Sequence, residues 1–370
     1  MSNITKDAMY DAVAPDDFAA MLDGDRHLNR STAFDRIISA THDHFWDPLN
    51  PKYIDFSAPF DLENEPLVPE ETIIPLKTHY VSGHLKDPKE RVRFINEMTL
   101  WNFSSILHGE QGALNLSASL CHVLRDAGAQ EYAANQTREE ARHVTAFSKY
   151  IQARWGRPKP CGDVLKNLLV EIVAAPEVYK KIVGMQMIVE GLAMGSFALQ
   201  YRVNRDPVAT KLFQLVMTDE AFHHKFGKIW ADRTVPKLSQ SERNIVEDWA
   251  AHCVQALLFN QASPQQQHEM FDSFGLDPER VTAELKLIAT EARMRRSMSR
   301  ETSIFRALVK TLFNAGLITE RTRAFYATYV DLDELRSEGE RTVGDDIAAD
   351  GIAYLREINF QNRADAIAAQ

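Results

Sequence analysis

The sequence places Glu110 thirty residues before Glu140-Ala141-Arg142-His143, and Glu190 thirty residues before Glu220-Ala221-Phe222-His223. The same pattern, a single Glu followed by Glu-x-x-His, therefore occurs twice, and the second copy begins eighty residues after the first. Residues three apart lie on one face of an α-helix, so the Glu and His of each motif can bind one metal ion. The repeat predicts two helical hairpins that together hold a pair of metal ions.

The turn residues of the two hairpins support this interpretation. In the second hairpin, the helix from Glu190 can run to about Asn204, and Asp206-Pro207 then supplies an N-cap and a proline at the first helical position. In the first hairpin, Gly128 is expected to end the outgoing helix as a C-terminal glycine. Both hairpins should therefore place their ligands at the middle of a bundle.

Composition narrows the classes of protein. A length of 370 residues with 45% hydrophobic residues provides ample material for a globular core. The net charge of -10 argues against nucleic acid and an anionic membrane as main partners. The most apolar segment, 182–199, contains Glu190, and a lone carboxylate is costly in lipid, so we reject a membrane span. Three scattered cysteines and the absence of a secretory signal fit the cytoplasm.

The chain is predicted to be all-α and to form one structural domain. Residues 1–87 should form an N-terminal arm that wraps the core, residues 88–232 a four-helix bundle that holds the metals, and residues 233–370 further helices packed on the bundle. A short helix is expected at 31–46, and the proline-rich stretch 47–88 should be extended or turn. The other predicted helices are 88–127, 130–155, 162–173, 176–204, 208–231, 240–260, 278–298, 301–314, 319–330 and 344–357.

The donor set determines the chemistry that we expect. Four carboxylates and two imidazoles suit iron or manganese, and two divalent ions would balance the four carboxylate charges. Without metal, the mutual repulsion of the buried Glu side chains would raise their pKa values or loosen the helices. Asp219 precedes Glu220 and Glu139 precedes Glu140, and each can reach the histidine of the other hairpin and fix its tautomer.

The six-residue pattern resembles the ligand set of the ferritin-like di-iron carboxylate superfamily. The stretch from Asp219 to Gly227 is most similar to the second ligand motif of ribonucleotide reductase small subunits, related ligand-binding oxidases and bacterial monooxygenase hydroxylases. The resemblance covers about residues 90–232. It implies a ferritin-like four-helix bundle, two Fe ions (or an Mn/Fe pair) and a homodimer.

Several positions depart from these relatives. Phe147 replaces the radical-storing Tyr of the reductase subunits, and the ether-forming Val and Tyr of the oxidases correspond to Leu114 and Met185. Met194 stands where the hydroxylases carry Thr, and Val216 replaces the third His of the arylamine oxygenases. These differences indicate a less familiar subtype.

Other residues near the motifs have two interpretations. Glycines 184, 191 and 195 either allow close helix packing or mark a bulge and space beside the metals. An apolar set either lines a cavity for O2 and substrate or forms plain core: Leu114, Phe147, Met185, Gly191, Met194 and Phe197. His108 and His224 are expected to be structural, and His42 and His44 to face solvent or packing. Trp46 could hydrogen-bond to Asp219 as an electron relay, as in the reductases.

The resemblance implies an O2-activating non-haem di-iron oxygenase or oxidase. Its substrate would be an organic small molecule, which undergoes hydroxylation, N-oxygenation or desaturation. The sequence has no dinucleotide or flavin motif, so electrons should come from a separate reductase or ferredoxin. The alternatives are a radical-generating subunit resembling those of ribonucleotide reductases and, less favoured, a ferroxidase or iron-storage protein.

Overall fold

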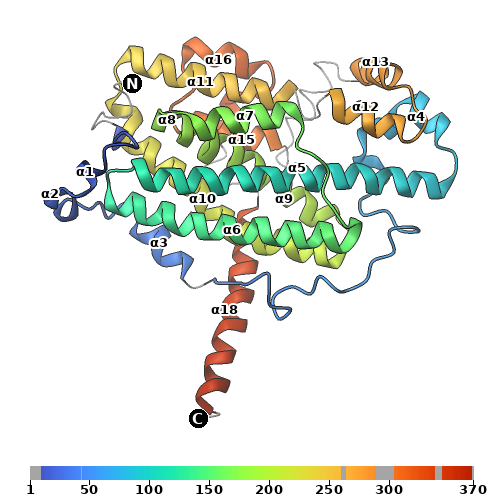
Figure 1. Ribbon diagram of the computed structural model, residues 1–370. Coiled ribbons are helices and arrows are strands. Elements are labelled where there is room, and N and C mark those ends of the chain that lie inside the picture. The colour runs from blue at the N-terminus through green and yellow to red at the C-terminus, as the bar shows by residue number, and fades with distance from the viewer. Residues whose placement is uncertain (1–9, 43, 260–263, 289–303, 338–343, 369–370) are drawn as a thin grey trace.

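The computed structural model describes residues 10–42, 44–259, 264–288, 304–337 and 344–368, and within these ranges the protein is all-helical (Figure 1). The described residues contain no strand, only an isolated bridge between Ala12 and Leu124. The bounds of the α-helices are α1 Phe18–Met21, α2 Gly24–Leu28, α3 Asp35–Thr41, α4 His79–His84, α5 Pro88–Val123, α6 Ala127–Trp155, α7 Asp163–Ala174, α8 Val178–Lys181, α9 Glu190–Val203, α10 Pro207–Thr234, α11 Gln240–Phe259, α12 Pro264–Asp272, α13 Pro278–Ile288, α15 Ile304–Asn314, α16 Glu320–Ala327, α17 Leu332–Ser337 and α18 Asp345–Ala368.

Three of the long helices begin at an aspartate N-cap. The Asp87 and Asp206 side chains each accept a backbone N–H of the first turn, and a proline follows each of them. Asp126 caps α6 by accepting from the N–H groups of Gly128 and Ala129. The interpretation of Gly128 as a C-terminal glycine is therefore wrong, because α5 already ends at Val123 and Gly128 belongs to the first turn of α6.

Gly128 is required for a different reason. A Cβ atom at this position would lie 2.6 Å from the backbone oxygen of Ser31. The glycine thus allows the N-terminal arm to approach the start of α6 closely, while Asp126 supplies the local signal that starts the helix.

The helix that carries Glu190 is irregular. It begins with α8, continues as the π-helical segment η5 over Ile182–Val189, and becomes regular again at Glu190, the first residue of α9. π-Helical turns are rare and occur mostly at functional sites. Residues 178–203 are long and apolar enough to cross a membrane, but 72% of their most apolar stretch is buried inside the protein.

The N-terminal arm is more helical than the sequence indicates. The helix predicted at 31–46 is restricted to α3, so Trp46 lies outside it. The stretch predicted as extended or turn contains two 3₁₀ turns, Glu70–Thr72 and Ile74–Lys77, and ends in α4. Helix α3 packs on α6 and α10, beside the bundle.

The C-terminal helices cover the bundle from several sides. α15 packs on α9 and η5, and α11 packs on η5. The first turns of α18 pack on α10, and the rest of α18 points away from the other helices (Figure 1). α18 extends beyond the predicted end at residue 357. The predicted helices at 278–298 and 301–314 correspond to α13 and α15, and their residues 289–303 lie outside the described ranges.

The four long helical segments surround a polar layer between two apolar cores. α5 packs on α6, and α10 packs on α6, α9 and η5. Along α5, Glu110 lies between Leu107, which belongs to one core, and Ala113, which belongs to the other. The fold therefore brings Glu110 to an interior where few groups other than the remaining motif residues can meet its charge.

Candidate metal centre

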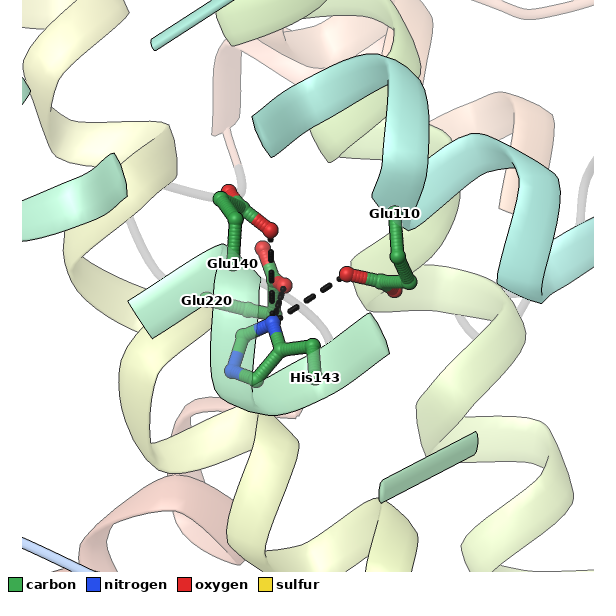
Figure 2. A group of neighbouring side chains, drawn as sticks. All are labelled: Glu110, Glu140, His143 and Glu220. Carbon is green, nitrogen blue, oxygen red and sulfur yellow. Dashed lines mark hydrogen bonds and ion pairs between the residues drawn. The ribbon is translucent and has the colours of Figure 1, made fainter. Parts of the chain in front are cut away.

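The structure brings all six motif side chains together. Glu110 comes from α5, the first Glu-x-x-His pair from α6, Glu190 from the start of α9, and the second pair from α10. Each is at most 5% exposed. In Figure 2, the carboxylates of Glu110, Glu140 and Glu220 converge on the His143 ring from three different helices.

These side chains form two overlapping groups of potential metal ligands. The first contains Glu110, Glu140, His143 and Glu220, and the second contains Glu140, Glu190, Glu220 and His223. Within each group, one ligand atom per residue lies within 4.8 Å of all the others. Glu140 and Glu220 belong to both groups, so each position has one Glu and one His of its own and two shared carboxylates.

The imidazole rings point the same nitrogen toward the shared carboxylates. Nδ1 of His143 lies 3.1 Å from Glu110, 3.3 Å from Oε2 of Glu140 and 3.2 Å from Oε1 of Glu220. Nδ1 of His223 lies 3.0 Å from Oε1 of Glu140 and 3.1 Å from Oε2 of Glu220. Each shared carboxylate therefore directs one oxygen to each histidine.

The opposite ring nitrogens meet carboxylates of the other hairpin. Nε2 of His143 lies 2.8 Å from Asp219 on α10, and Nε2 of His223 lies 2.9 Å from Glu139 on α6. These crossed contacts orient both rings, and in the neutral form of each ring they place the proton on Nε2, which leaves Nδ1 for a metal.

Asp219 lies at the centre of a larger buried network. Arg142 donates to both Asp219 oxygens, and the Trp46 indole N–H donates at 2.9 Å. The Trp46 ring also stacks on His143, with the ring centroids 6.0 Å apart. The structure thus contains the Trp46–Asp219 hydrogen bond that the sequence suggested, although Trp46 lies outside α3.

His44 comes closer to this network than the sequence indicated. Its ring stacks on Phe222, and its Nε2 lies 3.4 Å from Asp219. His44, Glu139 and Asp219 form a third group of possible metal ligands. The Arg142 guanidinium already contacts both acidic members of that group, so a cation is present there and a metal ion would meet its repulsion.

Two buried glutamines lie next to the six candidate ligands. The Gln136 amide donates to Glu140 at 3.0 Å and to Glu190 at 3.3 Å, and its oxygen accepts from Gln186 at 2.9 Å. Both glutamines are fully buried. Sequence reasoning missed them, although each stands four residues before a ligand Glu and therefore on the same helical face.

In the metal-free protein, the six groups divide into proton-holding and charged members. Burial raises the pKa of Glu110 to about 8 and the pKa of Glu190 well above its usual value. Burial also acts on Glu140 and Glu220, but the neighbouring histidines outweigh it and hold the pKa of both carboxyls below the usual value. Burial disfavours charged histidines, yet the surrounding carboxylates raise the pKa of His143 and His223 well above the ordinary value.

This residue set fits two divalent metal ions. Protonated as above, the six side chains are formally neutral, with two imidazoliums balancing two carboxylates. Two divalent ions in place of four protons would keep the same neutrality. Oε2 of Glu140 is buried and faces Nδ1 of His143 at 3.3 Å without a well-formed hydrogen bond, so this oxygen is available to a metal ion. Oxygen-rich donors with one imidazole each suit iron or manganese.

The residues predicted as possible cavity walls come from several elements and from both apolar cores, and their role as a cavity lining stays a prediction. Phe147, Met194 and Phe197 belong to one apolar core and Met185 to the other. Leu114 is half-buried on α5, and Gly191 packs near Leu308 and Thr311 of α15. An open surface depression of about 400 Å³ between α5 and α7 is lined by other residues, among them Gln111 and Leu169.

The other histidines considered in the sequence analysis do not belong to the two groups of potential ligands. His108 contacts the backbone oxygen of Lys159 at 2.9 Å, and His224 lies 3.4 Å from Thr311. Burial lowers the pKa of His224 to about 4, so this ring is neutral near neutral pH. His42 is exposed.

Comparison with known proteins gives no family assignment. No protein-family model matches the chain, and no curated protein matches it.

Proposed function

We propose that this protein is a dinuclear metal oxidase or oxygenase of the ferritin-like superfamily, with two iron ions held by Glu110, Glu140, His143, Glu190, Glu220 and His223. The observation that carries the proposal is the pair of four-residue ligand groups that share Glu140 and Glu220. A shared pair of carboxylates would hold two metal ions close together, which would allow both ions to act on one small molecule. When bound, two ferrous ions supply the electrons that activate O2 for oxidation of an organic substrate.

The chain's own residues have definite tasks in this proposal. Asp219 and Glu139 hold the two imidazoles with Nδ1 toward the metal positions. The apolar cores on both sides exclude water, so the charge of metal ions bound here would be weakly screened. Glu110 and Glu190, which retain protons when no metal is present, can pass them on when metals bind.

The substrate class and electron supply follow from the resemblance. We expect an organic small molecule that undergoes hydroxylation, N-oxygenation or desaturation, and electrons from a separate reductase or ferredoxin. We also expect a homodimer. A mixed Mn/Fe pair is compatible with the same donors.

One observation favours a second candidate function. Trp46, Asp219 and His143 form a continuous hydrogen-bonded chain from the N-terminal arm to a ligand of the centre. Such a chain suits electron transfer between the centre and a protein partner, as in a radical-generating subunit. Purification with a nucleotide-reducing partner would favour this function, whereas turnover of a small molecule by the chain alone would favour the oxygenase.

The decisive experiment is anaerobic loading with Fe(II), followed by metal analysis and by Mössbauer and optical spectroscopy after exposure to O2. We expect two irons per chain and a spectral change whose decay quickens with one class of compound. Glu140→Ala and His223→Ala should lose metal and activity but keep their helicity by circular dichroism. Retention of two metals per chain by either variant would refute the ligand assignment.

A further inference from the structure

Gln136 and Gln186 form a buried amide pair on one side of the candidate centre. Gln136 lies on α6, one helical turn before Glu140, and Gln186 lies in η5, one turn before Glu190. The Gln186 amide donates to the Gln136 oxygen at 2.9 Å. The Gln136 oxygen accepts from Gln186 while its NH2 group donates to the two carboxylates, and these contacts together hold the Gln136 amide in one orientation.

The amide pair supports only one of the two metal positions. The Gln136 NH2 group contacts Glu190, which belongs to the group with His223 alone. It also contacts Oε1 of Glu140, the oxygen directed at His223, whereas Oε2 is directed at His143. On the other side, the hydrogen-bond partner of Glu110 among the described residues is His143, and no amide reaches it there.

The hydrogen-bonded pair of glutamines is not an efficient way to stabilise the folded protein. The Gln186 oxygen is buried and has no hydrogen-bond partner among the described residues. An unpaired buried carbonyl costs free energy, and two apolar side chains of the same length would avoid that cost. Its useful feature is a fixed NH2 group aimed at two ligand oxygens.

We propose that Gln136, oriented by Gln186, is a positioning residue that makes the two metal positions unequal by holding Glu190 and one oxygen of Glu140 ready for the metal on the His223 side. This inference rests on the proposed dinuclear centre and deepens it. The first metal ion binds at the position with Glu190 and His223, and it binds there more tightly, because the ligands of that position are already oriented. The position with Glu110 and His143 fills second.

The test separates the two positions with isosteric variants and uses Co(II) as an optical probe of binding. Glu110→Gln leaves mainly the position near His223, and Glu190→Gln leaves mainly the position near His143. In the Glu110→Gln protein, Gln136→Met should weaken Co(II) binding on the order of 10- to 100-fold, the usual effect of losing a hydrogen bond to a metal ligand. In the Glu190→Gln protein, the same change should have little effect. In the otherwise unchanged chain, Gln136→Met should weaken only one of the two Co(II)-binding steps.

A double-mutant comparison distinguishes positioning from general packing. Gln186→Met should weaken the same binding step by itself but add nothing once Gln136 is Met, because Gln186 acts through Gln136. In the unchanged chain the Gln186 oxygen is unpaired, and in Gln186→Met the Gln136 oxygen would be unpaired instead. The number of unpaired buried carbonyls stays the same, so the unfolding midpoint should hardly change. Gln200→Met, at a buried glutamine near the far end of α9, is the matched control and should leave both steps intact.

The outcomes are distinct. Equal weakening of both steps, or no weakening in the Glu110→Gln protein, would overturn the inference while leaving the dinuclear centre in place. Additive effects of the two Gln→Met changes would overturn the role of Gln186. An unchanged chain that binds no divalent ion would refute the proposed function itself, and the inference with it.

Discussion

The Glu140 carboxylate is the negative charge that both halves of the candidate centre share. It is fully buried, it belongs to both ligand groups, and it faces a histidine with each of its oxygens. In the absence of metal, the cationic groups that meet this carboxylate among the described residues are the protonated rings of those two histidines. The protonation of the imidazoles and the occupation of the site by metal are therefore alternatives, and one must replace the other.

Metal binding should consequently release protons in a defined number. Near neutral pH, Glu110, Glu190, His143 and His223 hold a proton each in the metal-free protein, because their pKa values are raised. Each of the four groups must lose this proton before its carboxylate oxygen or its Nδ1 can bind a metal ion. Two divalent ions should therefore displace about four protons. Calorimetric titration in buffers of different ionisation enthalpy measures this number.

The Glu110→Gln variant provides the control for proton release. It removes one of the four groups that hold a proton and leaves mainly the metal position near His223, so His143 also keeps its proton and the count should fall by about two. Release of a single proton or none by the unchanged chain would mean that the free site is not protonated as the burial of these groups requires.

At the scale of the elements, the contact between η5 and α10 sets the position of Gln186 and Glu190. A Cβ atom at Gly227 of α10 would lie 2.8 Å from Met187 and 3.1 Å from the backbone oxygen of Gln186. The absence of a side chain at Gly227 thus lets α10 approach the π-helical segment at its backbone, one turn from His223.

Gly227→Ala should destabilise the protein despite the better helix propensity of alanine. The propensity gain is about 1 kcal/mol, whereas overpacking against a backbone atom costs about 1–3 kcal/mol. Gly109→Ala is the matched control, because a Cβ atom there meets nothing within 4 Å, and it should stabilise the protein. Chemical denaturation of the two variants compares them directly. Equal stability of the two variants would show that the close approach at Gly227 carries no constraint.

The sequence predicted most of the helices and the convergence of the six motif side chains, but it did not predict contacts between distant segments. Helical periodicity and the Asp206-Pro207 signal give α10 closely, because capping is a local interaction. Gly128 was misread, because its role depends on the distant backbone of Ser31. The Trp46–Asp219 and Gln136–Gln186 hydrogen bonds join residues far apart in the sequence, and the periodicity of either segment alone cannot reveal the pairing.

At the scale of the whole molecule, the buried centre links folding to pH. Glu110, Glu190, His143 and His223 have raised pKa values in the folded, metal-free protein, so it holds protons that the unfolded chain releases. Their contribution to stability is full below the ordinary pKa values of 4.5 for Glu and 6.5 for His. It is lost as the pH rises through the folded-state values, which for Glu110 is about 8. Asp219, Glu140 and Glu220 have lowered pKa values, so they have the opposite effect on stability. Their contribution is full at neutral pH and is lost as the pH falls into the strongly acidic range.

The metal-free protein should therefore be most stable at mildly acidic pH and should lose unfolding free energy from there to pH 8 and above. Metal ions replace the protons, so the loaded protein should not show this alkaline decline. Urea unfolding across this pH range, with chelator or with bound Fe(II) under anaerobic conditions, measures both curves. In Glu110→Gln the amide cannot ionise, and the metal-free decline should become shallower near pH 8. Metal-free stability that instead rises toward pH 8 would mean that the four carboxylates tolerate one another without protons or metal, and the requirement for a cation at the centre of the bundle would disappear.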